Sequence, residues 1–131
     1  MTACESSLMS GAALSKRVLV VDDAPAIRDI IARVLRAAGH EVTLAVDGAD
    51  GLRRFRGDHW DVIITDFQMP NMNGEEMTAA IKAEDPEMVV IMVTGSQGIV
   101  QNPGAFHAFI AKPFRRQELL EIVQSAPCRN W

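Results

Sequence analysis

Five side chains that could take part in chemistry stand at or just after the ends of short apolar segments: Asp22, Asp23, Asp66, Thr94 and Lys112. The apolar segments are residues 18–21, 62–64, 88–93 and 106–111. An aspartate after a strand usually caps a helix or faces solvent, so no one of these residues is informative alone. If the segments are parallel strands, however, their carboxyl ends meet at one edge of a sheet. The sequence then predicts that carboxylates, a hydroxyl and an ammonium group share one crevice.

Such a group of carboxylates needs a counter-charge. Two carboxylates about 4 Å apart repel each other by roughly 4 kcal/mol at an effective dielectric constant of ~20. Three close pairs raise that cost to the order of 10 kcal/mol, which one lysine offsets only in part. The cluster must therefore take up a proton or bind a divalent cation. Oxygen ligands without histidine or cysteine favour Mg²⁺ over a softer metal such as zinc.

The three histidines of the chain lie outside this set of residues. The sequence predicts His40 in a turn, His59 in a loop and His107 in an edge strand. We expect none of them to have a functional role.

Hydrophobic periodicity from residue 16 onward predicts strands that alternate with helices. The predicted strands are residues 18–21, 41–46, 62–64, 88–93 and 106–111. The predicted helices are residues 25–39, 47–57, 74–84 and 115–125. This alternation is typical of an α/β protein with a doubly wound, five-stranded parallel sheet. The first, third and fourth strands are apolar throughout, so we expect them at the centre of a sheet with the order 2-1-3-4-5.

Composition limits the class of protein further. With 131 residues, 48% of them hydrophobic and 23% charged, the chain has the size and balance of one globular domain. We expect a flexible leader at residues 1–15, the domain at 16–125 and a short tail at 126–131. The net charge of −4 argues against direct nucleic-acid binding, and no apolar run approaches the ~20 residues that span a membrane. Cys4 and Cys128 lack metal-ligand spacing, which favours a reduced, cytoplasmic protein.

A resemblance to a known family rests on four motifs, VLVVDD, VIITDFQMPNMNG, IMVTG and AKPF. In this order they resemble the signature of the two-component response regulator receiver domain, over residues 16–125. The resemblance implies the flavodoxin-like receiver fold and a bacterial, single-domain, chemotaxis-regulator-like signalling protein. A sensor histidine kinase or a phosphotransfer protein would supply the phosphoryl group, and the signal would pass to an unidentified protein by contact. Such a domain catalyses its own aspartyl phosphorylation and slow dephosphorylation.

The resemblance also implies a ligand set for Mg²⁺. Asp23 and Asp66 would bind the ion directly, and Asp22 would act mainly through water. The backbone carbonyl of Gln68 would supply a further ligand.

A second set of implied roles concerns phosphorylation and its readout. Asp66 would accept the phosphoryl group, Lys112 would pair with it, and Thr94 would donate its hydroxyl group. The bond between Lys112 and Pro113 would be cis. Phe109 would be the aromatic residue that changes position with Thr94 on activation, although a plain core role is equally compatible with the sequence. Because phenylalanine lacks the polar tip of tyrosine, such a switch would be weak.

The chain departs from the family pattern between Thr94 and Lys112. Only residues 95–111 intervene, and strand 106–111 takes up part of that length. Glycines and a proline punctuate the remainder, so at most one or two helical turns fit between Gln97 and Asn102. The fourth helix of the fold should therefore be shortened or irregular.

Two alternatives to a phosphorylated receiver follow from these observations. The shortened region is compatible with a degenerate receiver that binds proteins without phosphorylation. A flavin-carrying domain of similar topology would need a phosphate-binding loop after the first strand, but the sequence there is DDAPA, which repels phosphate in the absence of a metal.

Overall fold

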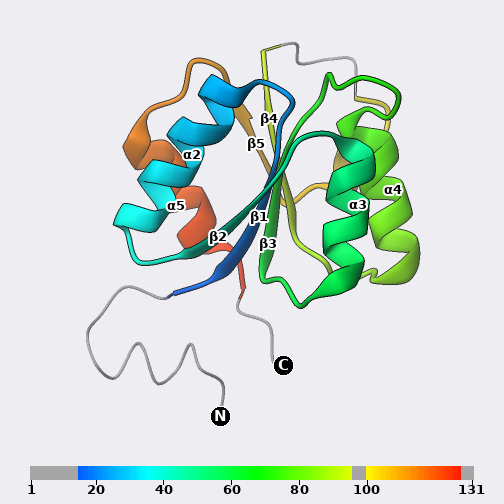
Figure 1. Ribbon diagram of the computed structural model, residues 1–131, viewed down its shortest axis with the longest axis horizontal. Coiled ribbons are helices and arrows are strands. Elements are labelled where there is room, and N and C mark those ends of the chain that lie inside the picture. Colours follow the sequence, from blue (N-terminus) through cyan, green and yellow to red (C-terminus); the bar gives the residue numbers. More distant parts are fainter. Residues whose placement is uncertain (1–14, 96–99, 128–131) are drawn as a thin grey trace.

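A five-stranded parallel sheet forms the centre of the computed structural model, which describes residues 15–95 and 100–127 (Figure 1). The strands are β1 (Arg17–Val21), β2 (Glu41–Ala45), β3 (Val62–Asp66), β4 (Val90–Thr94) and β5 (Ala108–Ala111). Their order is β2-β1-β3-β4-β5, with all neighbours parallel. The structure confirms the doubly wound α/β fold, with β2 and β5 at the edges.

Helices cover both faces of the sheet. They are α2 (Pro25–Ala37), α3 (Gly48–Gly57), α4 (Gly74–Glu84) and α5 (Arg116–Ser125). Figure 1 shows α2 and α5 on one face and α3 with α4 on the other. The side chains of successive residues of β1 point to opposite faces of the sheet, as they do along any strand. Val18 and Val20 pack into the core beneath α2 and α5, whereas Leu19 and Val21 pack beneath α3 and α4.

Side-chain caps fix where α3 and α4 begin. The carboxylate of Asp47 accepts a hydrogen bond from the backbone N–H of Asp50 at 2.8 Å. At α4, Asn73 and Glu76 form a reciprocal capping box with distances of 2.8 and 2.9 Å. Such caps satisfy N–H groups that lack a partner within the helix.

The strand boundaries differ from the predicted ones at the carboxyl half of the chain. β3 and β4 extend through Asp66 and Thr94, so these residues belong to the sheet itself. β5 starts at Ala108 rather than at residue 106, because Pro103–Ala105 forms a short 3₁₀ helix, η1. The N–H of Phe106 closes this turn on the carbonyl of Pro103 at 3.2 Å. His107 accordingly lies just before the edge strand rather than within it.

The helical turns predicted between Gln97 and Asn102 lie largely outside the described residues. Residues 100–102 are described, and they are not helical.

Lys16, just before β1, is completely buried, which the sequence did not predict. Its Nζ donates hydrogen bonds to the carbonyl oxygens of Val123, Gln124 and Ala126 at the end of α5. Its backbone N–H donates to Nδ1 of His40 at 3.1 Å. Burial lowers the pKa of the Lys16 ammonium group. Carbonyls at a helix end lack intrahelical donors, so Lys16 ties the start of the sheet to the last helix.

Within residues 15–95 and 100–127, every helix is too short or too polar to cross a membrane.

Candidate functional site

The register of β1 and β3 brings three carboxylates together at the carboxyl edge of the sheet. Val21 pairs with Thr65, so Asp22 and Asp66 both follow this last common pair. Each of Asp22, Asp23 and Asp66 places a carboxylate oxygen within 4.8 Å of the others. Asp22 and Asp66 are buried, whereas Asp23 is exposed.

The next two strands bring the hydroxyl and the ammonium group to the same edge. Val93 of β4 pairs with Asp66, so Thr94 stands one residue beyond that pair. Thr94 pairs with Ala111 of β5, and its carbonyl accepts the backbone N–H of Lys112 at 3.0 Å. The Lys112 ammonium nitrogen lies 3.3 Å from Oδ1 of Asp66. The peptide bond that follows Lys112 is cis. All five residues singled out from the sequence thus line one edge of the sheet.

Asp22 is the most deeply buried of the three carboxylates. It is 1% exposed, and its Oδ1 accepts the N–H of Ala24 at 2.9 Å. Its Oδ2 is buried and has no hydrogen-bond partner among the described residues, although Lys112 Nζ lies 3.8 Å away. Burial raises the pKa of Asp22, and the charges of Asp66 and Asp23 raise it further. The ionised cluster therefore has an unsatisfied oxygen and excess negative charge, a set of donors that fits a hard divalent cation.

Asp66 lies at the boundary between the core and solvent. It is 9% exposed, and its Oδ1 accepts the backbone N–H of Phe67 at 2.8 Å. A shallow depression outside it is lined by Asp23, Asp66, Phe67, Gln68, Met69 and Asn73. Through this opening a reactant can reach the carboxylate. Gln68 lies on the rim and is exposed.

Gly74, the first residue of α4, allows the helix to approach the site closely. A Cβ atom built on Gly74 would lie 2.1 Å from the carbonyl oxygen of Asp66, far inside any real contact. The Gly74 N–H donates to the carbonyl of Phe67 at 2.7 Å. Only glycine permits this approach, so the start of α4 is held directly against the end of β3.

Arg28 is a residue near the site that sequence reasoning missed. Its Nη1 donates to the backbone carbonyl of Asp22 at 2.8 Å, and its own N–H donates to the carbonyl of Ala24 at 3.0 Å. It thereby braces the loop that carries two of the three carboxylates. The sequence feature that could have indicated its role is a positive charge in the first turn of a helix. The helix dipole disfavours positive charge there unless a partner compensates for it.

Phe109, His40 and His107 are not among the five residues at the carboxyl edge of the sheet. Phe109 is half-buried on β5, and its ring centroid lies 5.3 Å from that of Phe106 at an interplanar angle of 53°. His40 contacts the backbone of Lys16, and Nε2 of His107 lies 3.1 Å from the hydroxyl of Ser125. No histidine belongs to the candidate metal cluster within the part of the chain that the structure describes.

The fold and this edge of the sheet can be compared with known families. The family model described as "Response regulator receiver domain" matches residues 18–124. This chain belongs to the response regulator receiver domain family. Receiver domains of response regulators act in two-component signalling, which gives the broad class of the chain.

The receiver domain is similar to curated regulators from several bacteria. It is 30% identical over 111 residues to the response regulator MprA of Mycobacterium ulcerans, covering 82% of this chain and 48% of that protein. It is 35% identical over 116 residues to the CAI-1 autoinducer sensor kinase/phosphatase CqsS of Vibrio cholerae, covering 82% of this chain and 17% of that protein. The chain therefore spans about half the length of MprA, and it spans 17% of the length of CqsS.

Solved structures of receiver domains resemble this one over nearly their full length. The response regulator TrrA of Thermotoga maritima, solved in complex with Mg²⁺-BeF, superimposes with a TM-score of 0.79 and 31% identity. That comparison covers 83% of this chain and 96% of TrrA. The backbone therefore has the receiver fold that the family assignment from the sequence implies.

Proposed function

We propose that this receiver domain is a phosphorylation-activated signalling switch that accepts a phosphoryl group on Asp66 with the help of Mg²⁺. The observation that carries the proposal is the cluster of Asp22, Asp23 and Asp66, with carboxylate oxygens within 4.8 Å of one another. The buried Oδ2 of Asp22, which has no hydrogen-bond partner among the described residues, gives it direct support.

The proposed step is a phosphoryl transfer between two nucleophiles. A carboxylate oxygen of Asp66 forms the new bond to phosphorus. The bond from phosphorus to the imidazole nitrogen of the kinase phosphohistidine, or to the oxygen of a small phosphodonor, breaks. The leaving atom keeps the bonding electron pair, and an imidazole nitrogen can then take a proton from water. Such transfers depend mainly on positioning and on neutralising charge on the phosphoryl oxygens.

Each residue of the site has a role in that scheme. Lys112, already 3.3 Å from Asp66, pairs with the carboxylate before transfer and with phosphoryl oxygens afterwards. The Thr94 hydroxyl donates to the phosphoryl group from the end of β4. The N–H of Phe67 holds Oδ1 of Asp66 in position at 2.8 Å. Phe109 is the proposed partner of Thr94 in the structural response.

The donors for a metal fit Mg²⁺. Asp23 and Asp66 would hold it directly, Asp22 through water, and Gln68 through its backbone carbonyl. When bound, Mg²⁺ supplies positive charge against the carboxylates and the phosphoryl oxygens. The structure of TrrA with Mg²⁺-BeF supports this choice of ion, because TrrA shares 31% identity with the chain.

The proposed partners follow from the same scheme. A sensor histidine kinase or a phosphotransfer protein in the cytoplasm supplies the phosphoryl group, and a downstream protein reads the phosphorylated state by contact. Support comes from MprA, named a response regulator, and from CqsS, named a sensor kinase/phosphatase.

Intact-mass spectrometry after incubation with acetyl phosphate and Mg²⁺ tests the proposal. Wild-type protein should gain one phosphoryl group, and Asp66→Asn should gain none. Asp29→Asn is the matched control, because Asp29 is an exposed aspartate of α2 outside the site, and it should be phosphorylated normally. No gain in the wild type would defeat the proposal.

Magnesium titration separates the switch from a receiver that binds proteins without phosphorylation. The proposed site should bind Mg²⁺ saturably by calorimetry, and binding should be lost in Asp23→Asn. A wild-type protein without saturable binding would instead favour the phosphorylation-independent module.

A further inference from the structure

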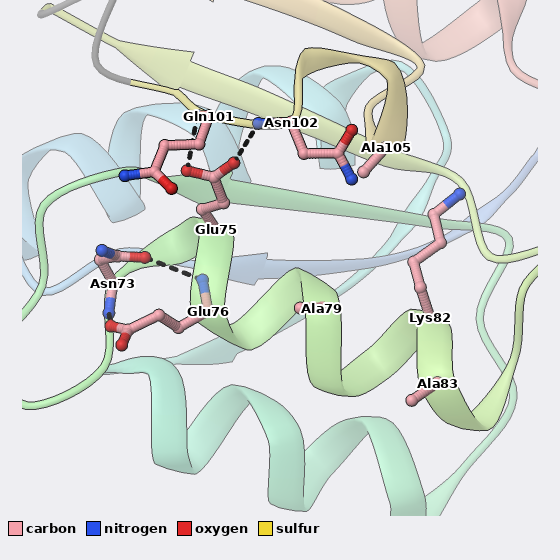
Figure 2. Close-up of a pocket in the computed structure, with 9 residues that line it drawn as sticks. All are labelled: Asn73, Glu75, Glu76, Ala79, Lys82, Ala83, Gln101, Asn102 and Ala105. Atoms are coloured by element: carbon pink, nitrogen blue, oxygen red, sulfur yellow. Dashed lines mark hydrogen bonds between the residues drawn. The ribbon is translucent and has the colours of Figure 1, made fainter.

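The carboxylate of Glu75 connects the start of α4, which follows β3, with the segment that follows β4. Glu75 is the second residue of α4 and is half-buried. Its two oxygens accept the backbone N–H groups of Gln101, at 3.0 Å, and Asn102, at 2.6 Å. Dashed lines mark both hydrogen bonds in Figure 2. These N–H groups belong to the segment that connects β4 with η1. One side chain thus joins the start of α4 to the chain that follows Thr94.

The α4 end of this bridge is fixed to the phosphorylation site. Gly74, adjacent to Glu75, packs against the carbonyl of Asp66 so closely that a Cβ would lie 2.1 Å from it. The N–H of Gly74 also bonds to the carbonyl of Phe67 at 2.7 Å. A change in backbone position at Asp66 therefore cannot leave the first turn of α4 unaffected, because closely packed groups transmit small displacements.

The other end of the bridge leads into β5. Asn102 precedes η1, and its carbonyl accepts the N–H of Ala105 at 3.1 Å. Phe106, next in the chain, is 8% exposed, and its ring centroid lies 5.3 Å from that of Phe109. A shift at Asn102 therefore reaches the aromatic pair through a short, hydrogen-bonded turn.

Glu75 also lines a depression between α4 and residues 101–105. A surface depression of about 770 Å³ separates α4 from residues 101–105. Figure 2 shows short side chains around it, among them Ala79, Ala83 and Ala105. Alanine side chains have no atom that can accept a hydrogen bond, whereas the Glu75 carboxylate accepts two from residues 101 and 102.

We propose that Glu75 couples the state of the Asp66 site to the conformation of residues 100–105, so that this segment carries the signal on the α4 side of the domain. The coupling rests on the proposed function, since phosphorylation is the event that would drive it. Glu75 is a positioning residue in this scheme and touches no reacting atom. A contiguous path of hydrogen bonds and packed residues is a physical basis for such coupling.

A double-mutant cycle read by NMR measures the coupling without requiring phosphorylation. Backbone amide shifts of Gln101 and Asn102 are recorded in wild type, Asp66→Asn, Glu75→Ala and the double variant. We expect Asp66→Asn to move both signals in the wild-type background and to move them by less than half as much when Glu75 is alanine. Adding Mg²⁺ and beryllofluoride to wild type and Glu75→Ala should give the same contrast.

Hydrogen exchange provides the second measurement and the controls. Glu75→Ala should make the Gln101 and Asn102 amides exchange about tenfold faster, the effect of losing a hydrogen bond to a charged group. Glu75→Gln, which keeps one acceptor oxygen, should restore part of the protection. Glu87→Ala removes an exposed glutamate just before β4 and should change neither amide. Circular dichroism confirms that each variant is folded.

Two results would overturn the coupling. One is an equal response of Gln101 and Asn102 to Asp66→Asn with and without Glu75. The other is unchanged exchange of both amides in Glu75→Ala. Absence of phosphorylation in the mass assay, together with the expected cycle, would reject the proposed function while supporting the coupling.

Discussion

The ammonium nitrogen of Lys112 lies 3.3 Å from Oδ1 of Asp66 and 3.8 Å from Oδ2 of Asp22, so one cation faces two carboxylates. Asp23 adds a third carboxylate within 4.8 Å of the other two. The site therefore keeps a net negative charge when all three aspartates are ionised. This imbalance governs several expected properties of the domain.

Replacing Lys112 with methionine should destabilise the metal-free domain by about 1–2 kcal/mol at neutral pH, because the carboxylates lose their cation. Saturating Mg²⁺ should reduce this loss, since the ion supplies the missing charge. Urea unfolding with and without Mg²⁺ measures both effects. Lys82→Met, which removes a lysine near the far end of α4, is the control for losing one positive charge. Equal destabilisation by both substitutions would contradict the expectation.

Asp22 should give the metal-free domain a recognisable pH dependence. Its folded-state pKa is raised, chiefly by burial, above an unfolded value of about 3.9. A carboxyl group with a raised pKa binds its proton more tightly in the folded state. Its contribution is thus most favourable below the unfolded value and is lost as the pH rises through the folded value.

Asp22→Asn should accordingly be more stable than wild type at neutral pH without Mg²⁺, and the difference should disappear below about pH 3.9. The difference between the two proteins is the quantity to measure, because other carboxylates oppose the trend. Arg56, for example, lowers the pKa of Glu84, so that this pair loses stability as the pH falls. Urea unfolding over a pH series tests the prediction, and a wild-type protein more stable than the variant at neutral pH would refute it.

Gly74→Ala should distort the junction of β3 and α4. The added Cβ would lie 2.1 Å from the carbonyl oxygen of Asp66, so backbone must move. We expect a loss of about 1–3 kcal/mol, as for other overpacked sites, together with weaker Mg²⁺ binding. Gly57→Ala is the matched control, because a Cβ there meets nothing within 4 Å. Denaturation and calorimetry on the two variants should differ sharply, and similar behaviour would count against the close approach.

Lys16→Met should destabilise the domain by about 2–4 kcal/mol, because three carbonyls at the end of α5 lose their buried donor. The rate of amide exchange should increase more in the last turn of α5 than in β3. Hydrogen exchange with mass spectrometry resolves the two regions. Uniform acceleration throughout the domain would show that Lys16 contributes only to global stability.

The sequence alone predicted the sheet order and the set of residues at its carboxyl edge. The apolar character of three strands distinguished the centre of the sheet from its edges, and the end of each strand located the polar residues. Both inferences hold because burial and side-chain alternation are local properties that a sequence records directly.

Other features depended on contacts between residues far apart in the chain. In the sequence, Lys16 cannot be told from a solvent-exposed lysine, because its burial depends on contact with the end of α5. Glu75 likewise cannot be told from other glutamates in the first turn of a helix, because its partners are residues 101 and 102. The burial of Asp22, and the lack of a hydrogen-bond partner for its Oδ2 among the described residues, likewise follow from how the strands and helices pack around it. Residue types and periodicity determined which groups meet at the edge of the sheet. Only the tertiary structure decided their desolvation and their partners, because those energies depend on distances that sequence spacing does not fix.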